Sequence, residues 1–146
     1  MPTAAKLFAT IVLGGAAFLA GWLFIREIPG ATRIDYLPLF AVGYGLFFGW
    51  FMVGAQARRG RVTMLQIGLT AMAYVTVMVL LSTAFVMMIR QSMNMHYSGL
   101  SEALIDIIQK ALDLAQKGLF PDVIIVLILG GAFGGLIAHW AGRRWP

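Results

Sequence analysis

Four long runs that lack any charged residue constrain the fold of this chain more than any other feature of its sequence. A helix needs about 20 apolar residues to cross a hydrocarbon core of about 30 Å, at about 1.5 Å per residue. The runs cover residues 7–25, 36–57, 62–89 and 123–142. The sequence therefore predicts an all-α membrane protein, in which four transmembrane helices form one integral membrane domain over residues 1–146.

The composition favours a bilayer environment and narrows the range of partners. Hydrophobic residues make up 60% of the chain and charged residues 12%, against about 25% charged residues in soluble domains. The net charge of +5 comes from basic residues in short segments at helix ends, so nucleic acid is not an expected partner. Because the chain has no cysteine, disulfides and thiolate metal sites are excluded. We expect no cofactor.

Charges of opposite sign are sorted along the chain. All six acidic residues fall in segments 26–35 and 90–122, whereas segments 1–6, 58–61 and 143–146 carry only basic residues. Since short cytoplasmic loops are rich in Lys and Arg, the pattern predicts a bacterial inner-membrane protein with both termini in the cytoplasm. A role in topology and in contacts with lipid phosphates is assigned to Arg58, Arg59, Arg61, Arg143 and Arg144. A second hypothesis is that the first three of these guanidinium groups hold an oxyanion.

An amphipathic helix is predicted at about 99–117, between the third and fourth spans. Its apolar residues recur at helical spacing, and they are Leu100, Leu104, Ile107, Ile108, Ala111, Leu112 and Ala115. Ser98 is the expected N-cap and Gly118 the expected stop. Because the polar side carries acidic residues, capture by anionic lipid is not favoured. We expect this helix to lie in the outer interface, to cover the helix bundle or to dock a partner protein.

Small residues four positions apart indicate places where helix backbones approach each other closely. The pairs are Gly45 with Gly49, Gly130 with Gly134, and Gly131 with Gly135. Two uses are open for them. They pack helices within this bundle, or they dock the chain on other membrane subunits or on a second copy of itself.

The predicted spans contain no Asp, Glu, Lys or Arg, and this argues against several functions. Proton- or ion-coupled transport usually needs an ionisable group in the membrane. The only histidines, His96 and His139, are expected on opposite sides of the bilayer, so one haem cannot be held by both. No plausible Ser, His and Asp triad is present, and we do not expect an enzyme.

Two other functions remain as alternatives. One is a passive permease or channel for a small solute, with a polar path lined by Tyr44, Gln66, Thr70, Tyr74 and Thr76. The other is handling of Cu(I) outside the cytoplasm, because thioether and imidazole ligands suit that ion. Its expected ligands are Met93, Met95 and His96.

Several short segments resemble those of a known family. They are Met1-Pro2-Thr3-Ala4-Ala5-Lys6, Met88-Ile89-Arg90, Tyr97-Ser98-Gly99, Glu102-Ala103-Leu104 and Ala141-Gly142-Arg143-Arg144-Trp145-Pro146. Over its full length the chain resembles the TrgA family of small membrane proteins associated with tellurite resistance. The resemblance implies an inner-membrane protein linked to oxyanion stress and brings no catalytic site with it. We therefore expect a non-enzymatic accessory or assembly subunit of a larger membrane complex or of a tellurite-resistance system.

Overall fold

The computed structural model describes residues 4–28, 35–57, 59–93 and 98–145, and helices dominate these ranges, which contain no strand. The helices are α1 (Ala4–Glu27), α2 (Leu37–Phe48), α3 (Arg61–Ser92), α4 (Leu100–Lys117) and α5 (Pro121–Arg144). The predicted all-α fold is confirmed. Four helical segments, namely α1, α2 with its extension to Gln56, α3 and α5, are long and apolar enough to cross a membrane.

Helices α1, α3 and α5 extend slightly beyond their uncharged runs, whereas the second span ends within its run. Pro121 occupies the first turn of α5, where its missing N–H is not needed and its fixed φ suits a helix. Gly60 precedes α3 with an extended ψ of 153°. At 32 residues, α3 is about 48 Å long, and it exceeds a bilayer core of about 30 Å.

The second span is helical throughout but changes its geometry part-way. After Phe48, α2 continues as a π-helical turn at Gly49–Val53 and then as a 3₁₀ turn at Gly54–Gln56. A Cβ atom on Gly49 would lie 2.8 Å from the Thr10 Cα atom in α1. The wider turn therefore starts at a glycine that touches the backbone of α1.

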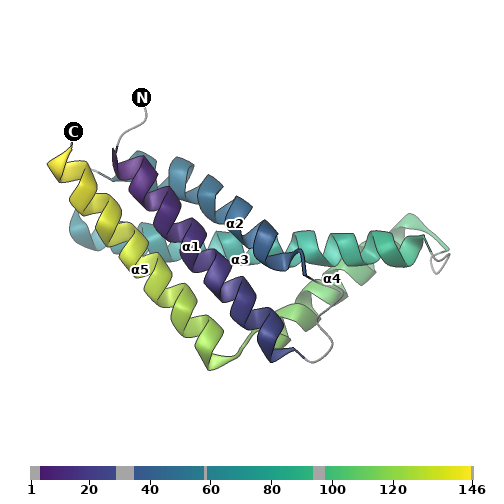
Figure 1. Ribbon diagram of the computed structural model, residues 1–146. Coiled ribbons are helices and arrows are strands. Elements are labelled where there is room, and N and C mark those ends of the chain that lie inside the picture. Colours follow the sequence, from purple (N-terminus) through teal and green to yellow (C-terminus); the bar gives the residue numbers. More distant parts are fainter. Residues whose placement is uncertain (1–3, 29–34, 58, 94–97, 146) are drawn as a thin grey trace.

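Figure 1 shows α1 lying between α2 and α5, with α3 running across the bundle behind them. The contacts agree, because α1 packs on α2 and α5, and α3 packs on α5 and α2. The two marked chain ends lie at the same end of the bundle (Figure 1). The C-terminal end of α3 projects beyond the other spans, and α4 folds back along it to form a hairpin (Figure 1). This α3–α4 hairpin is the part of the fold that departs most from a simple bundle.

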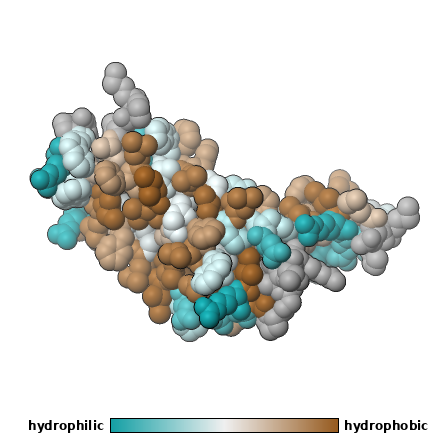
Figure 2. All heavy atoms as spheres, in the orientation of Figure 1, coloured by the Kyte–Doolittle hydropathy of each residue, from teal (hydrophilic) through white to brown (hydrophobic). Residues whose placement is uncertain are grey.

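Small side chains fill the interior, and many large apolar ones lie outside. The core includes buried Ala5, Ala9, Ala17, Ala71 and Ala138. Large apolar residues cover much of the outer surface of the bundle (Figure 2), and they include Ile11, Leu39, Phe51, Val62, Leu69 and Ile125. Such an arrangement lets helix axes approach closely while apolar surface faces outwards, which suits a lipid environment. Among the described residues, Thr83 is the only buried polar side chain.

Candidate functional site

The closest helix contact joins α3 to α5 through glycines. A Cβ atom on Gly131 would lie 2.9 Å from the Gly68 carbonyl oxygen, and one on Gly68 would overlap the Gly131 carbonyl oxygen. One turn further, a Cβ atom on Gly135 would overlap the carbonyl oxygen of Met64. The two backbones therefore touch directly, and any side chain at these positions would force them apart.

The remaining predicted glycines contact α1. A Cβ atom on Gly130 would overlap Ala16, and one on Gly134 would overlap the Leu13 side chain. On the other side of α1, a Cβ atom on Gly45 would lie 2.9 Å from the Cα atom of Gly14. Together with Gly49, which meets Thr10, all six predicted packing glycines lie at contacts between helices of this chain.

The residues proposed for a solute path are not gathered around one channel. Gln66, Thr70 and Tyr74 are exposed on the outside of α3. Tyr44 shares a hydrogen bond of 2.6 Å with the Ser82 hydroxyl. The Thr76 hydroxyl donates to a carbonyl oxygen of its own helix, 2.8 Å away, so the structure does not connect these side chains into a polar path.

An apolar cavity of about 260 Å³ lies where all five helices meet. Its lining includes Phe24 of α1, Ala41 of α2, Val79 of α3, Leu114 of α4 and Val123 of α5. The end of α4 thus closes over the end of the bundle that holds the last turn of α1 and the first turn of α5. With a lining this apolar, the cavity offers shape but few polar groups to orient a ligand.

The α3–α4 hairpin is held by a polar contact on one side of α4. The Lys110 ammonium group lies 2.5 Å from a carboxylate oxygen of Asp106 and also donates to the Gln91 amide oxygen on α3. Both charged side chains are about four-fifths buried. Ala103 and Leu114 are buried on α4 as well, so this side of the helix faces the rest of the protein.

The apolar stripe of α4, by contrast, is left uncovered. More than half of the surface of each large side chain on this stripe is exposed, and the residues are Leu100, Leu104, Ile105, Ile108 and Leu112. The sequence placed an apolar side on this helix correctly. It did not show that Ile107, Ala111 and Ala115 of that side would be partly buried while its other large residues stay exposed.

The start of α4 differs from the expectation in one detail. Gly99, and not Ser98, is the N-cap, and it forms no side-chain cap bond. The Ser98 hydroxyl and N–H instead donate to a Glu102 carboxylate oxygen, at 2.6 and 3.1 Å. These bonds, led by the hydroxyl, lower the pKa of Glu102. Gly118 follows the last residue of α4, as predicted.

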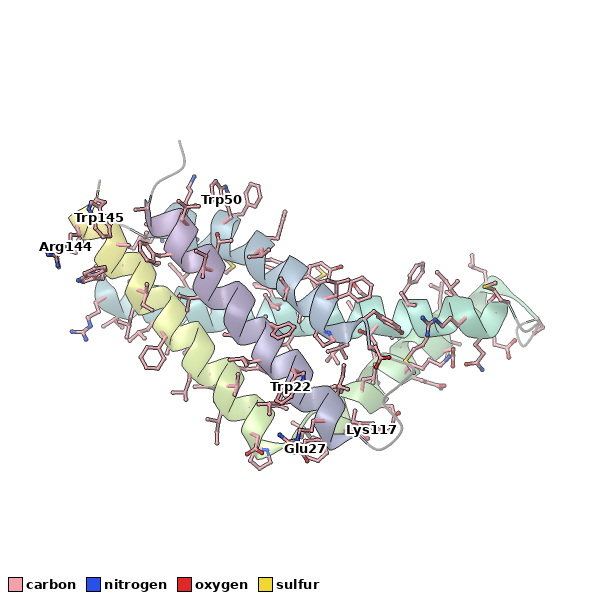
Figure 3. All side chains as sticks on the ribbon, viewed as in Figure 1. Trp22, Glu27, Trp50, Lys117, Arg144 and Trp145 are labelled. Atoms are coloured by element: carbon pink, nitrogen blue, oxygen red, sulfur yellow. The ribbon has the colours of Figure 1, made fainter. Side chains whose placement is uncertain are left out.

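Opposite the hairpin, the bundle ends in a basic surface. The described basic residues here, Lys6, Arg59, Arg61, Arg143 and Arg144, come from the ends of α1, the second span, α3 and α5. Figure 3 shows Trp50, Trp145 and Arg144 at this end, and Trp22, Glu27 and Lys117 at the other. Arg58 lies outside the described residues. We call this surface the basic end.

Aromatic rings accompany the cations at the basic end. The Lys6 ammonium group lies 5.7 Å from the centre of the Trp50 ring, and the Arg144 guanidinium lies 5.3 Å from that of Trp140. Cations over aromatic faces are attracted to them, and Trp is common at membrane interfaces. The Trp145 ring contacts Trp140 edge-on, with ring centres 5.7 Å apart. Aromatic rings, and not acidic side chains, therefore contact the Lys6 and Arg144 cations.

Two hollows open at the basic end. One, of about 290 Å³, has Lys6, Gln56 and Arg59 among its polar lining. The other is a groove of about 730 Å³ along α5, and its polar lining comprises Arg61, His139, Trp140, Arg143 and Arg144. Four of the five arginines assigned to lipid contact are therefore described, and they lie at this end, beside one hollow or the other.

The proposed Cu(I) ligands cannot be placed together. Met93 is described and is 80% exposed at the end of α3, while Met95 and His96 lie outside the described residues. His139, at the basic end, has a buried Nδ1 atom without a hydrogen bond to any described residue. In the described ranges, no group of three His, Asp or Glu side chains is placed to hold a metal ion.

Gly68 is a contact residue that the sequence pattern missed. It has no small partner four positions away, since Met64 and Met72 occupy those places. Its role depends on the glycines of α5 that face it. A lone glycine within a long apolar run was the only available signal, and such a residue has several possible explanations.

Comparison with known proteins gives no relative. No protein-family profile matches the chain, and neither a curated protein nor a solved structure matches it.

Proposed function

We propose that this chain is a non-enzymatic inner-membrane protein that docks other membrane subunits, or a second copy of itself, through its α3–α4 hairpin. The observation that carries this proposal is the exposed apolar stripe of α4, formed by Leu100, Leu104, Ile105, Ile108 and Leu112. The four apolar segments and the outward-facing large side chains support a position in a bilayer. The basic end is cytoplasmic in this proposal, and the hairpin lies outside.

The stripe is large enough to contribute to association. Fully burying one Leu or Ile side chain stabilises a protein by about 1.5–3 kcal/mol. Since each of these side chains is already partly covered, a partner would gain about 1 kcal/mol from each of them. A helix with this pattern fits a groove on a partner, where residues at i, i+4 and i+8 act as anchors. Leu104, Ile108 and Leu112 have that spacing.

Two features favour a protein partner over the lipid surface alone. The exposed polar side of α4 carries Glu102 and Asp113, whereas helices that bind anionic membranes usually present basic residues there. The hairpin also projects past the other spans (Figure 1), so a neighbouring subunit can reach α4 without displacing the bundle.

The resemblance to the TrgA family suggests where such a complex would act. We place the protein in a system that protects the cell from tellurite or a related oxyanion. With no cysteine in the chain, thiol chemistry in that system would belong to another subunit.

Neither alternative function has comparable support. A permease would need polar side chains around a common path, and the proposed ones are spread over the outside of α3 or are bonded elsewhere. Of the three side chains proposed as Cu(I) ligands, only Met93 is among the described residues.

The test is purification from native membranes in a mild detergent, followed by identification of the chains that elute together. We expect recovery as an oligomer or with partner chains, and a monomer without partners would contradict the proposal. Ile108→Glu with Leu112→Glu should abolish the co-elution of partner chains or of the oligomer, because charges then enter the apolar contact. Gln109→Glu with Gln116→Glu adds the same charge to exposed polar positions of the same helix and should leave recovery unchanged.

A further inference from the structure

The groove along α5 has a graded lining. Its apolar part contains Phe133, Leu136 and Ile137, and its polar part contains His139, Trp140, Arg143 and Arg144. Phe133, Ile137, Trp140 and Arg144 are spaced at i, i+4, i+7 and i+11, so they follow one stripe of the helix. An amphipathic ligand would meet first apolar, then aromatic and finally cationic side chains along this stripe.

The length of the stripe matches half a membrane. Phe133 and Arg144 are eleven positions apart in one helix, which corresponds to about 16 Å along its axis. Half of a hydrocarbon core of about 30 Å measures about 15 Å. With the basic end at the cytoplasmic interface, the apolar part of the groove therefore lies at the depth of the acyl chains of that leaflet.

The glycine contact between α3 and α5 brings a third arginine to the groove. The Gly135 and Met64 backbones touch, and Arg61 begins α3 one turn before Met64. On α5, Arg143 and Arg144 follow Gly135 in the direction of the same end. Backbone contact between the helices therefore brings three guanidinium groups from two helices to the lining of one groove.

These cations are not neutralised by acidic side chains. All six Asp and Glu residues belong to the opposite end of the fold, at the close of α1, before α2, in α4 and at the start of α5. Arg144 is instead placed against the Trp140 ring. Guanidinium groups bind phosphate oxygens with two parallel hydrogen bonds, and basic pockets between helices on the cytoplasmic side suit anionic headgroups.

We infer that this groove binds an anionic phospholipid of the cytoplasmic leaflet. Arg61, Arg143 and Arg144 contact its phosphate groups, and one acyl chain lies along Phe133, Leu136 and Ile137. The inference rests on the membrane location in the proposed function, but it concerns the opposite end of the molecule from the docking hairpin. Free phosphate shares the headgroup chemistry and lacks the chain that the apolar lining would contact.

The experiment is native mass spectrometry of the full chain in a neutral detergent with equal amounts of phosphatidylglycerol and phosphatidylethanolamine. We expect the wild-type protein to retain phosphatidylglycerol preferentially. Each arginine near an anionic headgroup contributes about a fivefold gain in affinity. Arg61→Gln with Arg143→Gln and Arg144→Gln should therefore reduce the retention of phosphatidylglycerol by about a hundredfold.

A matched control separates the groove from net charge. Lys6→Gln with Arg26→Gln and Lys117→Gln removes three positive charges outside the groove and should keep the lipid preference. An equal loss in both variants would overturn the site. Replacing the three groove arginines by Lys preserves the positive charges that set topology but removes two-point hydrogen bonding. This variant should retain less phosphatidylglycerol than wild type and more than the Gln variant, and retention equal to wild type would contradict phosphate binding by the guanidinium groups.

Two further results decide the ligand and keep the two proposals apart. If inorganic phosphate stabilises the wild-type protein against heat as much as phosphatidylglycerol does, the phospholipid assignment is wrong. The Ile108→Glu and Leu112→Glu hairpin variant should keep the lipid preference of the wild type while losing its partners. If the wild-type protein elutes with its partners but retains the two lipids equally, the lipid site is wrong and the docking proposal stands.

Discussion

Where α3 crosses α5, backbone meets backbone through Gly68, Gly131 and Gly135, whereas α4 contacts α3 through side chains, among them the long polar ones of Lys110 and Gln91. At the first contact, small residues pack in the interior, and the large apolar side chains lie on the outside. At the second, Lys110 bridges Asp106 and Gln91, and the apolar stripe of α4 stays open. The bundle thus completes its own packing, whereas the hairpin leaves large apolar side chains of α4 exposed.

Membrane conditions give this difference a physical reason. Helices in lipid gain little from hiding apolar surface from each other, so close approach through small residues is what holds them. In the proposed membrane placement, α4 lies at the water-facing edge of the bundle, and an exposed apolar stripe gains free energy there when it is covered. A substitution should therefore have a large effect in the first region and a moderate one in the second.

The largest effect is expected from Gly68→Ala. Its Cβ atom would overlap the Gly131 carbonyl oxygen, and neither backbone can move without separating α3 from α5. We expect the free energy of unfolding to fall by about 3 kcal/mol, the upper end of the usual cost of overpacking a core. Thermal or denaturant unfolding in detergent measures this loss.

The same substitution at Gly15 is the control. A Cβ atom there meets nothing within 4 Å, so Gly15→Ala should stabilise α1 by up to about 1 kcal/mol through helix propensity. Similar destabilisation by both variants would show that the α3–α5 contact has no special role.

A moderate effect is expected from Lys110→Met, which removes the ammonium group and keeps the length of the side chain. Loss of the largely buried contact with Asp106 and Gln91 should weaken the hairpin by about 1 kcal/mol. Amide hydrogens of α4 should then exchange about fivefold faster, while those of α1 and α5 keep their rates.

Lys117→Met provides the comparison on the same helix. Its pair with Asp113, at 2.8 Å, is more than half exposed, and such pairs contribute only a few tenths of a kcal/mol, roughly. Equal acceleration of exchange in both variants would argue that Lys110 does not hold α4 to α3.

The smallest effect concerns the first turn of α4. Ser98→Ala removes the hydroxyl donor to Glu102, so the pKa of Glu102 should rise but stay below its ordinary value, because the Ser98 N–H still donates. Since the folded pKa is lowered, the stabilisation is present above the unfolded pKa of about 4.3 and is lost as pH falls through the folded value. An NMR titration of Glu102 measures its pKa in the wild type and in the variant. An unchanged pKa would contradict the role of the hydroxyl.

Much of the fold was predictable because its signals are local. The four uncharged runs gave the apolar helices to within a few residues, and the apolar residues recurring from Leu100 to Ala115 gave α4. The glycine pairs were also visible as spacings. Gly68 was not, because its importance comes from the residues of another helix that face it.

The candidate sites were only partly predictable. Arg61, Arg143 and Arg144 were recognisable as basic residues at helix ends, but the sequence contained no sign that they line one groove. Likewise, the apolar side of α4 was evident, while its exposure depended on which side of the helix packs on α3. Both outcomes depend on the rotation of one helix relative to another.

By itself, the sequence determined how many apolar helices form, where they begin and end, and how charges of each sign are divided between the loops. These properties follow from hydrogen bonding within a helix and from hydrophobicity, which act over neighbouring residues. Only the tertiary structure decided that α3 and α5 touch at Gly68, that α4 leaves its apolar stripe uncovered and that three arginines share a groove. Each of these depends on where two helices cross and how they are rotated. Both are determined by the steric fit between residues that are far apart in the sequence.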